Sequence, residues 1–154
     1  MFSNLLFFHS IFRWLLLIVL GYSIIKAYNG YVSNLVFSKI DNAFRHWTAT
    51  IAQIQLMIGI TLFSNSEIVK YFWKNVSVAS QHLDTLFFGI IHILLMIVSV
   101  VILTIGSAMA KRKMTDKDKF KTMFIWFSIA LFIIFIAIPW PFSPLANRPY
   151  FRHF

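Results

Sequence analysis

The sequence contains no cysteine. This absence excludes disulfide bonds, thiolate metal sites, iron–sulfur clusters and haem attached through thioether bonds. Histidine, methionine and oxygen atoms are therefore the only strong metal ligands that the chain offers.

Charge is also scarce, since only 12% of the 154 residues are charged and only five are acidic, whereas 59% are hydrophobic. Four apolar runs are long enough to cross a membrane, which takes about 20 residues each. They consume most of the chain and leave no soluble domain of useful size. We therefore predict an all-α integral membrane protein whose residues 1–154 form one four-helix bundle, with spans at about 5–28, 42–64, 85–110 and 117–138.

The net charge of +9 favours a membrane lipid rather than nucleic acid as the partner, because the basic residues of so apolar a chain lie beside anionic headgroups. By the positive-inside rule, the loops rich in lysine and arginine are cytoplasmic. The connection between spans two and three has only Lys70 and Lys74. The first and third connections, with the adjoining ends of the spans, have nine basic residues: Lys26, Lys39, Arg45, Lys111, Arg112, Lys113, Lys117, Lys119 and Lys121. This asymmetry predicts a multi-pass membrane protein with both termini on the side opposite the cytoplasm.

Several local signals predict where the spans begin and end. Asn29-Gly30 is expected to stop the first helix, and Asp41 or Asn42 to cap the second. Asp84 or Thr85 is expected to cap the third, and Thr115 with Asp118 resembles a capping box for the fourth. Pro139 and Pro141 are expected to end the fourth span, followed by an aromatic cluster of Trp140, Phe142, Tyr150 and Phe151. The stretch 65–84 is too polar to cross a membrane and predicts one helix lying at the membrane surface, with Tyr71 and Trp73 at the interface.

Ionisable side chains inside the spans are the strongest functional signal. His9 and Arg13 lie four residues apart in the first apolar run, so they share one face of a helix. Such groups normally face the interior of a bundle, a partner or a water-filled site rather than lipid. His92 is the one ionisable residue in the third span, on a stripe with Gly89, Met96 and Ser99 that allows a helix or a flat ligand to approach closely.

The second span carries polar residues at helical spacing: His46, Thr50, Gln53, Met57 and Thr61. We expect this face to point into the bundle, because Gln53 near the middle of a membrane needs a hydrogen-bond partner. A role for Gln53 in joining helices is favoured over a role at a ligand. His46 lies at the cytoplasmic end beside Arg45, where a surface position is favoured.

His9 and His92 are expected at a similar depth, about 6 Å and about 10 Å inside the outer ends of their helices, given a rise of about 1.5 Å per residue. Two histidines on different helices at one level can bind the iron of a haem b from opposite sides. Alternatively, they simply form hydrogen bonds between helices. Arg13, one turn deeper, has a haem propionate, a quinone oxygen or a neighbouring carbonyl as its candidate partner. His82 and His153 are expected outside the bundle.

Several long motifs support a resemblance to a known family: HSIFRW at 9–14, DNAFRHWTATIAQIQLMIG at 41–59, His92, GSAMAKRKMTDKDKFKTM at 106–123 and IPWPFSPLANRPYF at 138–151. Together they resemble short bacterial membrane proteins labelled cytochrome B, and the likeness covers nearly the whole chain. The resemblance implies a b-type cytochrome. Relatives often carry a histidine at the position of Gln53, so a family site that uses this position is altered here.

These observations predict a membrane-embedded haem b protein that exchanges electrons with a quinone or a partner redox protein. Its metal ligands are His9 and His92, with Arg13, Met96 and Gln53 as further cofactor-binding candidates. No nucleophile with a base is evident, which favours an electron carrier or a subunit over a stand-alone enzyme. The alternative is a cofactor-free accessory subunit of a larger membrane complex, or a homo-oligomer, which binds partners through its polar faces.

Overall fold

The computed structural model describes residues 2–146 and 148, and these residues form helices and connections without any β-strand. The elements in chain order are α1 (Phe2–Val32), α2 (Lys39–Asn65), α3 (Glu67–Lys74), α4 (Val76–Ala79), α5 (Leu83–Leu86), the π-helical turn η1 (Phe87–Ile91), α6 (His92–Arg112) and α7 (Asp116–Ala137). Four helical stretches are long and apolar enough to cross a membrane: α1, α2, the continuous stretch from α5 through α6, and α7. The predicted four-helix architecture is thereby confirmed.

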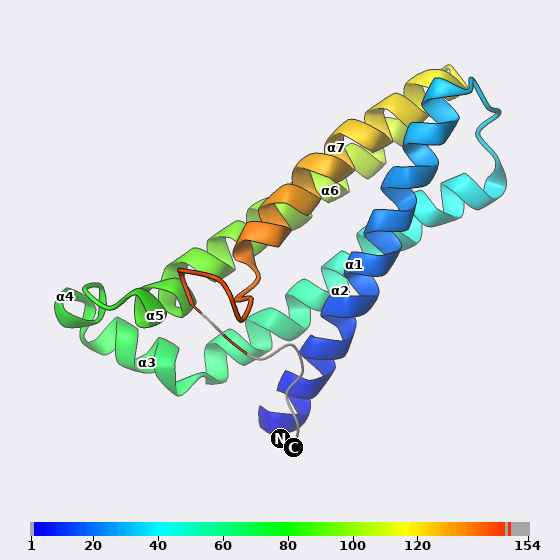
Figure 1. Cartoon of the computed structure of the whole chain (residues 1–154). Coiled ribbons are helices and arrows are strands. Elements are labelled where there is room, and N and C mark those ends of the chain that lie inside the picture. The colour runs from blue at the N-terminus through cyan, green and yellow to red at the C-terminus, as the bar shows by residue number, and fades with distance from the viewer. Residues whose placement is uncertain (1, 147, 149–154) are drawn as a thin grey trace.

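The four long helices form a ring in which α1 and α6 both pack between α2 and α7. Helices α1 and α6 therefore face each other across the centre of the bundle. Helix α7 lies along α6 over its length, whereas α1 and α7 diverge towards the end at which α1 begins and α7 ends (Figure 1). The bundle is consequently tightest at the loop between α6 and α7 and widest at the opposite end.

Glycines bring neighbouring helices close together at two places. A Cβ atom built on Gly106 of α6 would lie 2.2 Å from Cβ of Trp126, and one built on Gly30 of α1 would lie 2.5 Å from the ring of Phe120. Both distances are below van der Waals contact, so only glycine, which has no side chain, fits at each position without a shift of its neighbour. The third-span stripe predicted to face the interior is confirmed, since Gly89, Ser99, Leu103 and Gly106 are all buried.

The ends of the helices agree only in part with the sequence signals. Helix α1 continues past Gly30 to Val32 and ends before Asn34, whose φ of 49° is left-handed. The residue that caps α2 is Ser38, and Asp41 is its partner three residues on in a capping box, so the predicted cap at Asp41 or Asn42 is wrong.

The third span also begins differently, because α5 follows His82 without a side-chain cap. The hydroxyl of Thr85 instead donates to the carbonyls of Ala79 and His82. The predicted cap of α7 is confirmed, as the hydroxyl of Thr115 accepts from the amide of Asp118. Helix α7 ends at Ala137, just before the first proline.

The prediction that the polar face of α2 points into the bundle is wrong. His46, Gln53, Met57 and Thr61 are exposed on the outside of the helix. The face that packs inward carries Asp41, Arg45, Thr48, Ala49, Ala52, Gln55 and Leu62. The inner face is thus built mainly from small and polar residues that find partners on other helices, such as the hydroxyl of Thr48 at 2.8 Å from that of Ser23.

The stretch between α2 and α6 forms three short helices, α3 to α5, rather than the one predicted helix. Its inward residues are Val69 and Phe72, and the ring of Phe72 lies against Gly89. Tyr71 and Trp73 are exposed. In the predicted aromatic cluster, Trp140 stacks on Phe142 at 5.8 Å between ring centroids, whereas Tyr150 and Phe151 lie outside the described residues.

Candidate functional site

A cavity of about 180 Å³ lies between the helices near the end at which α1 begins and α7 ends. Its polar lining comes from three long helices and the chain that follows α7: His9, Ser10 and Arg13 of α1, Gln55 of α2, His92 of α6, and Arg148. Apolar residues, among them Leu16, Leu56, Leu62, Met96 and Ile134, complete the wall. The cavity is slightly larger than the roughly 150 Å³ that accommodates benzene in an engineered protein core.

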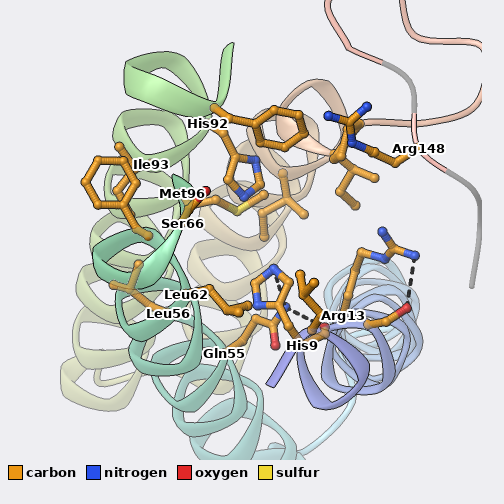
Figure 2. A pocket seen from close by; sticks show the side chains of 18 of the residues that line it. His9, Arg13, Gln55, Leu56, Leu62, Ser66, His92, Ile93, Met96 and Arg148 are labelled. Carbon is orange, nitrogen blue, oxygen red and sulfur yellow. Dashed lines mark hydrogen bonds between the residues drawn. The ribbon is translucent and has the colours of Figure 1, made fainter. Parts of the chain in front are cut away.

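The two predicted histidines face each other across this cavity. The centroids of the His9 and His92 rings are 6.5 Å apart and their planes cross at 70°. Figure 2 shows the imidazole of His92 directed from α6 towards the imidazole of His9 on α1. They meet because α1 and α6 are the pair of helices that oppose each other across the bundle.

His92 is fixed by a hydrogen bond and by the backbone that precedes it. Its Nδ1 lies 2.7 Å from the carbonyl oxygen of Ala137 at the end of α7. A carbonyl only accepts, so Nδ1 carries the proton and the lone pair of the neutral ring is on Nε2. The residue also follows the π-helical turn η1 directly, and such turns are frequent at functional sites because they re-aim the next side chain.

His9 is positioned by Gln55 on the neighbouring helix. The amide Nε2 of Gln55 donates to the carbonyl oxygen of His9 at 3.0 Å and lies 3.4 Å from Nε2 of the ring. An amide NH2 group only donates, so this contact assigns the lone pair of His9 to Nε2 as well. Gly59 leaves room for the ring, because a Cβ atom there would already touch Cε1 at 3.4 Å.

Two buried polar atoms of this pair have no hydrogen-bond partner among the described residues: Nδ1 of His9 and Oε1 of Gln55. Buried polar atoms are nearly always paired, and an exception marks a place where a ligand, ion or water completes the structure. The site is therefore polar, enclosed and incomplete in its hydrogen bonding.

Two arginines extend the cavity towards its rim. The guanidinium of Arg13 lies 3.5 Å from the hydroxyl of Ser10 and 5.5 Å from the ring of Trp14. Arg148 pairs with the carboxylate of Asp84 at 3.0 Å and lies over the ring of Phe88 at 4.8 Å. Both residues line the cavity, and the charge of Arg148 is balanced by Asp84.

The structure brings together four of the five residues that the sequence analysis singled out. His9, Arg13, His92 and Met96 line the cavity, whereas Gln53 does not. Gln53 is exposed on α2 and donates to the hydroxyl of Thr104 on α6 at 3.2 Å, which is the helix-joining role favoured for it. The residue that sequence reasoning missed is Gln55, two positions further on and on the opposite face of the helix.

Two further histidines, His46 and His82, do not line the cavity. His46 is exposed near the start of α2, and His82 is exposed before α5. His153 lies outside the described residues. Within the described part of the chain, no three histidine, aspartate or glutamate side chains gather as a metal site.

Two histidines in the cavity could hold a haem iron, which needs fewer ligands from the protein than a bare metal ion does. A bond from histidine to a metal is about 2 Å long and the ring centroid lies about 1 Å further, so two rings that share one metal have centroids about 6 Å apart. The observed separation of 6.5 Å is close to this value. Bare transition-metal ions generally take three or four protein ligands, whereas a porphyrin supplies four nitrogens of its own. His92 and His9 could each offer an Nε2 lone pair to such an iron, that of His9 once the amide of Gln55 moves away from it.

Comparison of the chain with protein-family models, with curated proteins and with solved structures finds no match. The inference of function therefore rests on the geometry of this site and on the sequence patterns that predicted it.

Proposed function

We propose that this chain is a membrane-embedded b-type haem protein that transfers electrons, and that His9 and His92 would hold the haem. The observation that carries the proposal is the 6.5 Å separation of two imidazoles across the bundle. The hydrogen bond from His92 to Ala137 adds to it, because ligating histidines almost always donate their second N–H to a carbonyl or carboxylate. The resemblance of the sequence to proteins labelled cytochrome B supports the same assignment.

The chain's own residues have distinct parts in this function. His92, held by α7, would keep its ring orientation, whereas Gln55 beside Nε2 of His9 would have to turn aside. The cavity of about 180 Å³ would have to widen to admit a macrocycle. Met96 in its wall has an unbranched, flexible side chain that could change its conformation to make room. Arg13 would attract a carboxylate group at the rim. A bound haem supplies reversible one-electron transfer at its iron.

The membrane setting follows from the charge asymmetry. The connection between α1 and α2 and that between α6 and α7 would face the cytoplasm of a bacterial cell, and both termini the periplasm. The site would then lie in the outer half of the inner membrane. The short helices α3 to α5 would rest at the outer interface, with Tyr71 and Trp73 among the headgroups. A quinone or a partner redox protein would reach the site from this side and exchange electrons there.

The orientation is tested by single cysteines introduced into this cysteine-free chain at Lys113 and Lys74. Intact cells are treated with a thiol reagent that does not cross the inner membrane. Labelling is expected at position 74 and not at position 113. The reverse pattern would place the histidine pair on the cytoplasmic side.

The function is tested by the reduced-minus-oxidised absorption spectrum of the protein purified from cells with ample haem. The wild type is expected to show b-type haem bands, and His9→Ala and His92→Ala to lose them or alter them grossly. Arg13→Leu is expected to keep the bands and to shift the midpoint potential, since it removes a charge near the cofactor and no ligand.

The matched control for the spectrum is His46→Ala, which removes an exposed histidine remote from the cavity and should leave the spectrum unchanged. A colourless but folded wild type would reject the haem assignment and favour the accessory-subunit alternative. Loss of the bands in His46→Ala with the protein folded would show that a different histidine is the ligand.

A further inference from the structure

A second pocket, of about 250 Å³, lies at the opposite end of the bundle from the histidine pair. It is lined by residues of four separate segments: Phe37 and Ser38 before α2, Lys39 and Asn42 on α2, Lys111 at the end of α6, and Lys119 at the start of α7. This is the end at which α1 stops and α7 begins in Figure 1. Three lysines thus converge from three different helices on one pocket.

The free hydrogen-bonding groups of the pocket side chains are donors. Among the described residues, Lys39 and Lys111 have no carboxylate partner, while Lys119 is paired with Asp116 at 2.9 Å. The hydroxyl of Ser38 is already used, because it donates to the carboxylate of Asp41 and accepts from the amide of that residue. The side chains of the pocket therefore leave an excess of positive charge unbalanced.

Asn42 also offers only hydrogen-bond donors to the pocket, because its amide oxygen is bound by Arg45. The buried guanidinium of Arg45 donates through Nε to Oδ1 of Asn42 at 3.0 Å, and through Nη1 to the carbonyl and hydroxyl of Ser107. Since Arg45 cannot accept, the amide oxygen must face it and the NH2 group of Asn42 remains for other partners. A pocket of ammonium groups and an amide NH2 is complementary to an anion with several acceptor oxygens.

We propose that this pocket binds the phosphate of an anionic phospholipid. The source of the phosphate is argued from the surroundings of the pocket. It lies at the ends of three membrane-crossing helices, the level at which lipid headgroups lie. Val36 and Ile40, next in sequence to the lining residues Phe37 and Lys39, are 78% and 62% exposed, and Met114, three residues after Lys111, is 93% exposed. Such apolar side chains suit contact with an acyl chain rather than with water. Basic pockets between transmembrane helices are a known way to hold anionic headgroups.

The proposal is tested by titrating phosphatidylglycerol into the purified protein in neutral maltoside micelles and counting bound lipids by native mass spectrometry. The wild type is expected to bind one phosphatidylglycerol in preference to phosphatidylcholine. The double variant Lys39→Gln/Lys111→Gln is expected to bind about 30-fold more weakly, since each basic residue near an anionic headgroup contributes about fivefold. Both residues are exposed, and thermal unfolding of the variant checks that it is folded.

The matched control is Arg112→Gln/Lys113→Gln, which removes the same charge from neighbouring exposed positions that do not line the pocket. Retention of tight binding in this control supports the pocket, whereas equal weakening in both double variants would overturn it in favour of unspecific charge attraction. In a final experiment, inorganic phosphate at millimolar concentration is added to the protein with bound phosphatidylglycerol, and loss of the lipid is measured. Displacement of the lipid by phosphate at that level would overturn the assignment to a lipid, because the headgroup phosphate alone would then account for binding.

Discussion

Replacement of Gly106 by alanine tests whether α6 and α7 touch as closely as the fold requires. The added Cβ atom would lie 2.2 Å from Cβ of Trp126, whereas ordinary contacts are 3.4–4 Å, so the two helices must part locally by more than 1 Å. The obstructing atom is attached directly to the backbone, and no rotamer change can move it away. Overpacking of this kind costs about 1–3 kcal/mol of unfolding free energy.

The matched variant is Gly21→Ala, also inside a long helix but with nothing within 4 Å of the added atom. Alanine favours a helix over glycine by about 1 kcal/mol at either position, so the difference between the two variants isolates the packing term. Gly106→Ala should therefore be less stable than Gly21→Ala by about 1–3 kcal/mol. Unfolding in mixed detergent micelles, followed by circular dichroism, measures both.

A further variant makes the test sharper. Trp126→Ala keeps the Cβ atom that obstructs Gly106→Ala, so it should not restore the stability of that variant when the two are combined. Equal stability of Gly106→Ala and Gly21→Ala, or full rescue by Trp126→Ala, would refute the packing described for α6 and α7.

Two other variants probe the polar interior. Arg45→Leu leaves the buried hydroxyl of Ser107 and its carbonyl without their donor, and should lower the unfolding free energy by about 1–3 kcal/mol in the same assay; wild-type stability would show that this network contributes nothing. Gln55→Leu should alter the haem spectrum or the midpoint potential because its amide touches His9, while Gln53→Leu should leave both unchanged because it bonds only to Thr104 on the outer side. An equal effect of the two substitutions would contradict the face assigned to α2.

Much of the fold could be predicted because apolar runs of membrane length have few alternatives. The spans, the stripe of small residues on α6 and the cap at Thr115 all rest on local rules of length, spacing and capping. The prediction that Asn29-Gly30 ends the first helix was wrong. Gly30 instead leaves space for the ring of Phe120, and the helix ends just before Asn34, which has a left-handed backbone conformation.

The face of α2 was mispredicted for a physical reason. Polar residues in a membrane helix were assumed to turn inward, yet Thr50 and Thr61 satisfy their hydroxyls on carbonyls four residues earlier in the same helix. They need no partner helix and are stable on the outer face. The inner face instead carries Arg45 and Gln55, whose donors reach carbonyls on other helices.

The sequence predicted the ionisable residues of the candidate site, but not the contacts that hold them in place. His9, Arg13 and His92 stood out because ionisable groups in apolar helices are costly, and depth along the helix placed the two histidines at one level. The π-helical turn before His92 and the hydrogen bond to Ala137 depend on how α6 meets α7. Neither the turn nor this hydrogen bond has a signature in the spacing of residues along the chain.

The central claim, that His9 and His92 together hold one haem, is tested most directly by electron paramagnetic resonance of the oxidised protein. Two imidazole ligands would give a low-spin ferric signal. Replacement of either histidine by alanine should convert this signal to high spin or abolish it, while His46→Ala should preserve it. A low-spin signal that survives in His9→Ala or in His92→Ala would contradict the account.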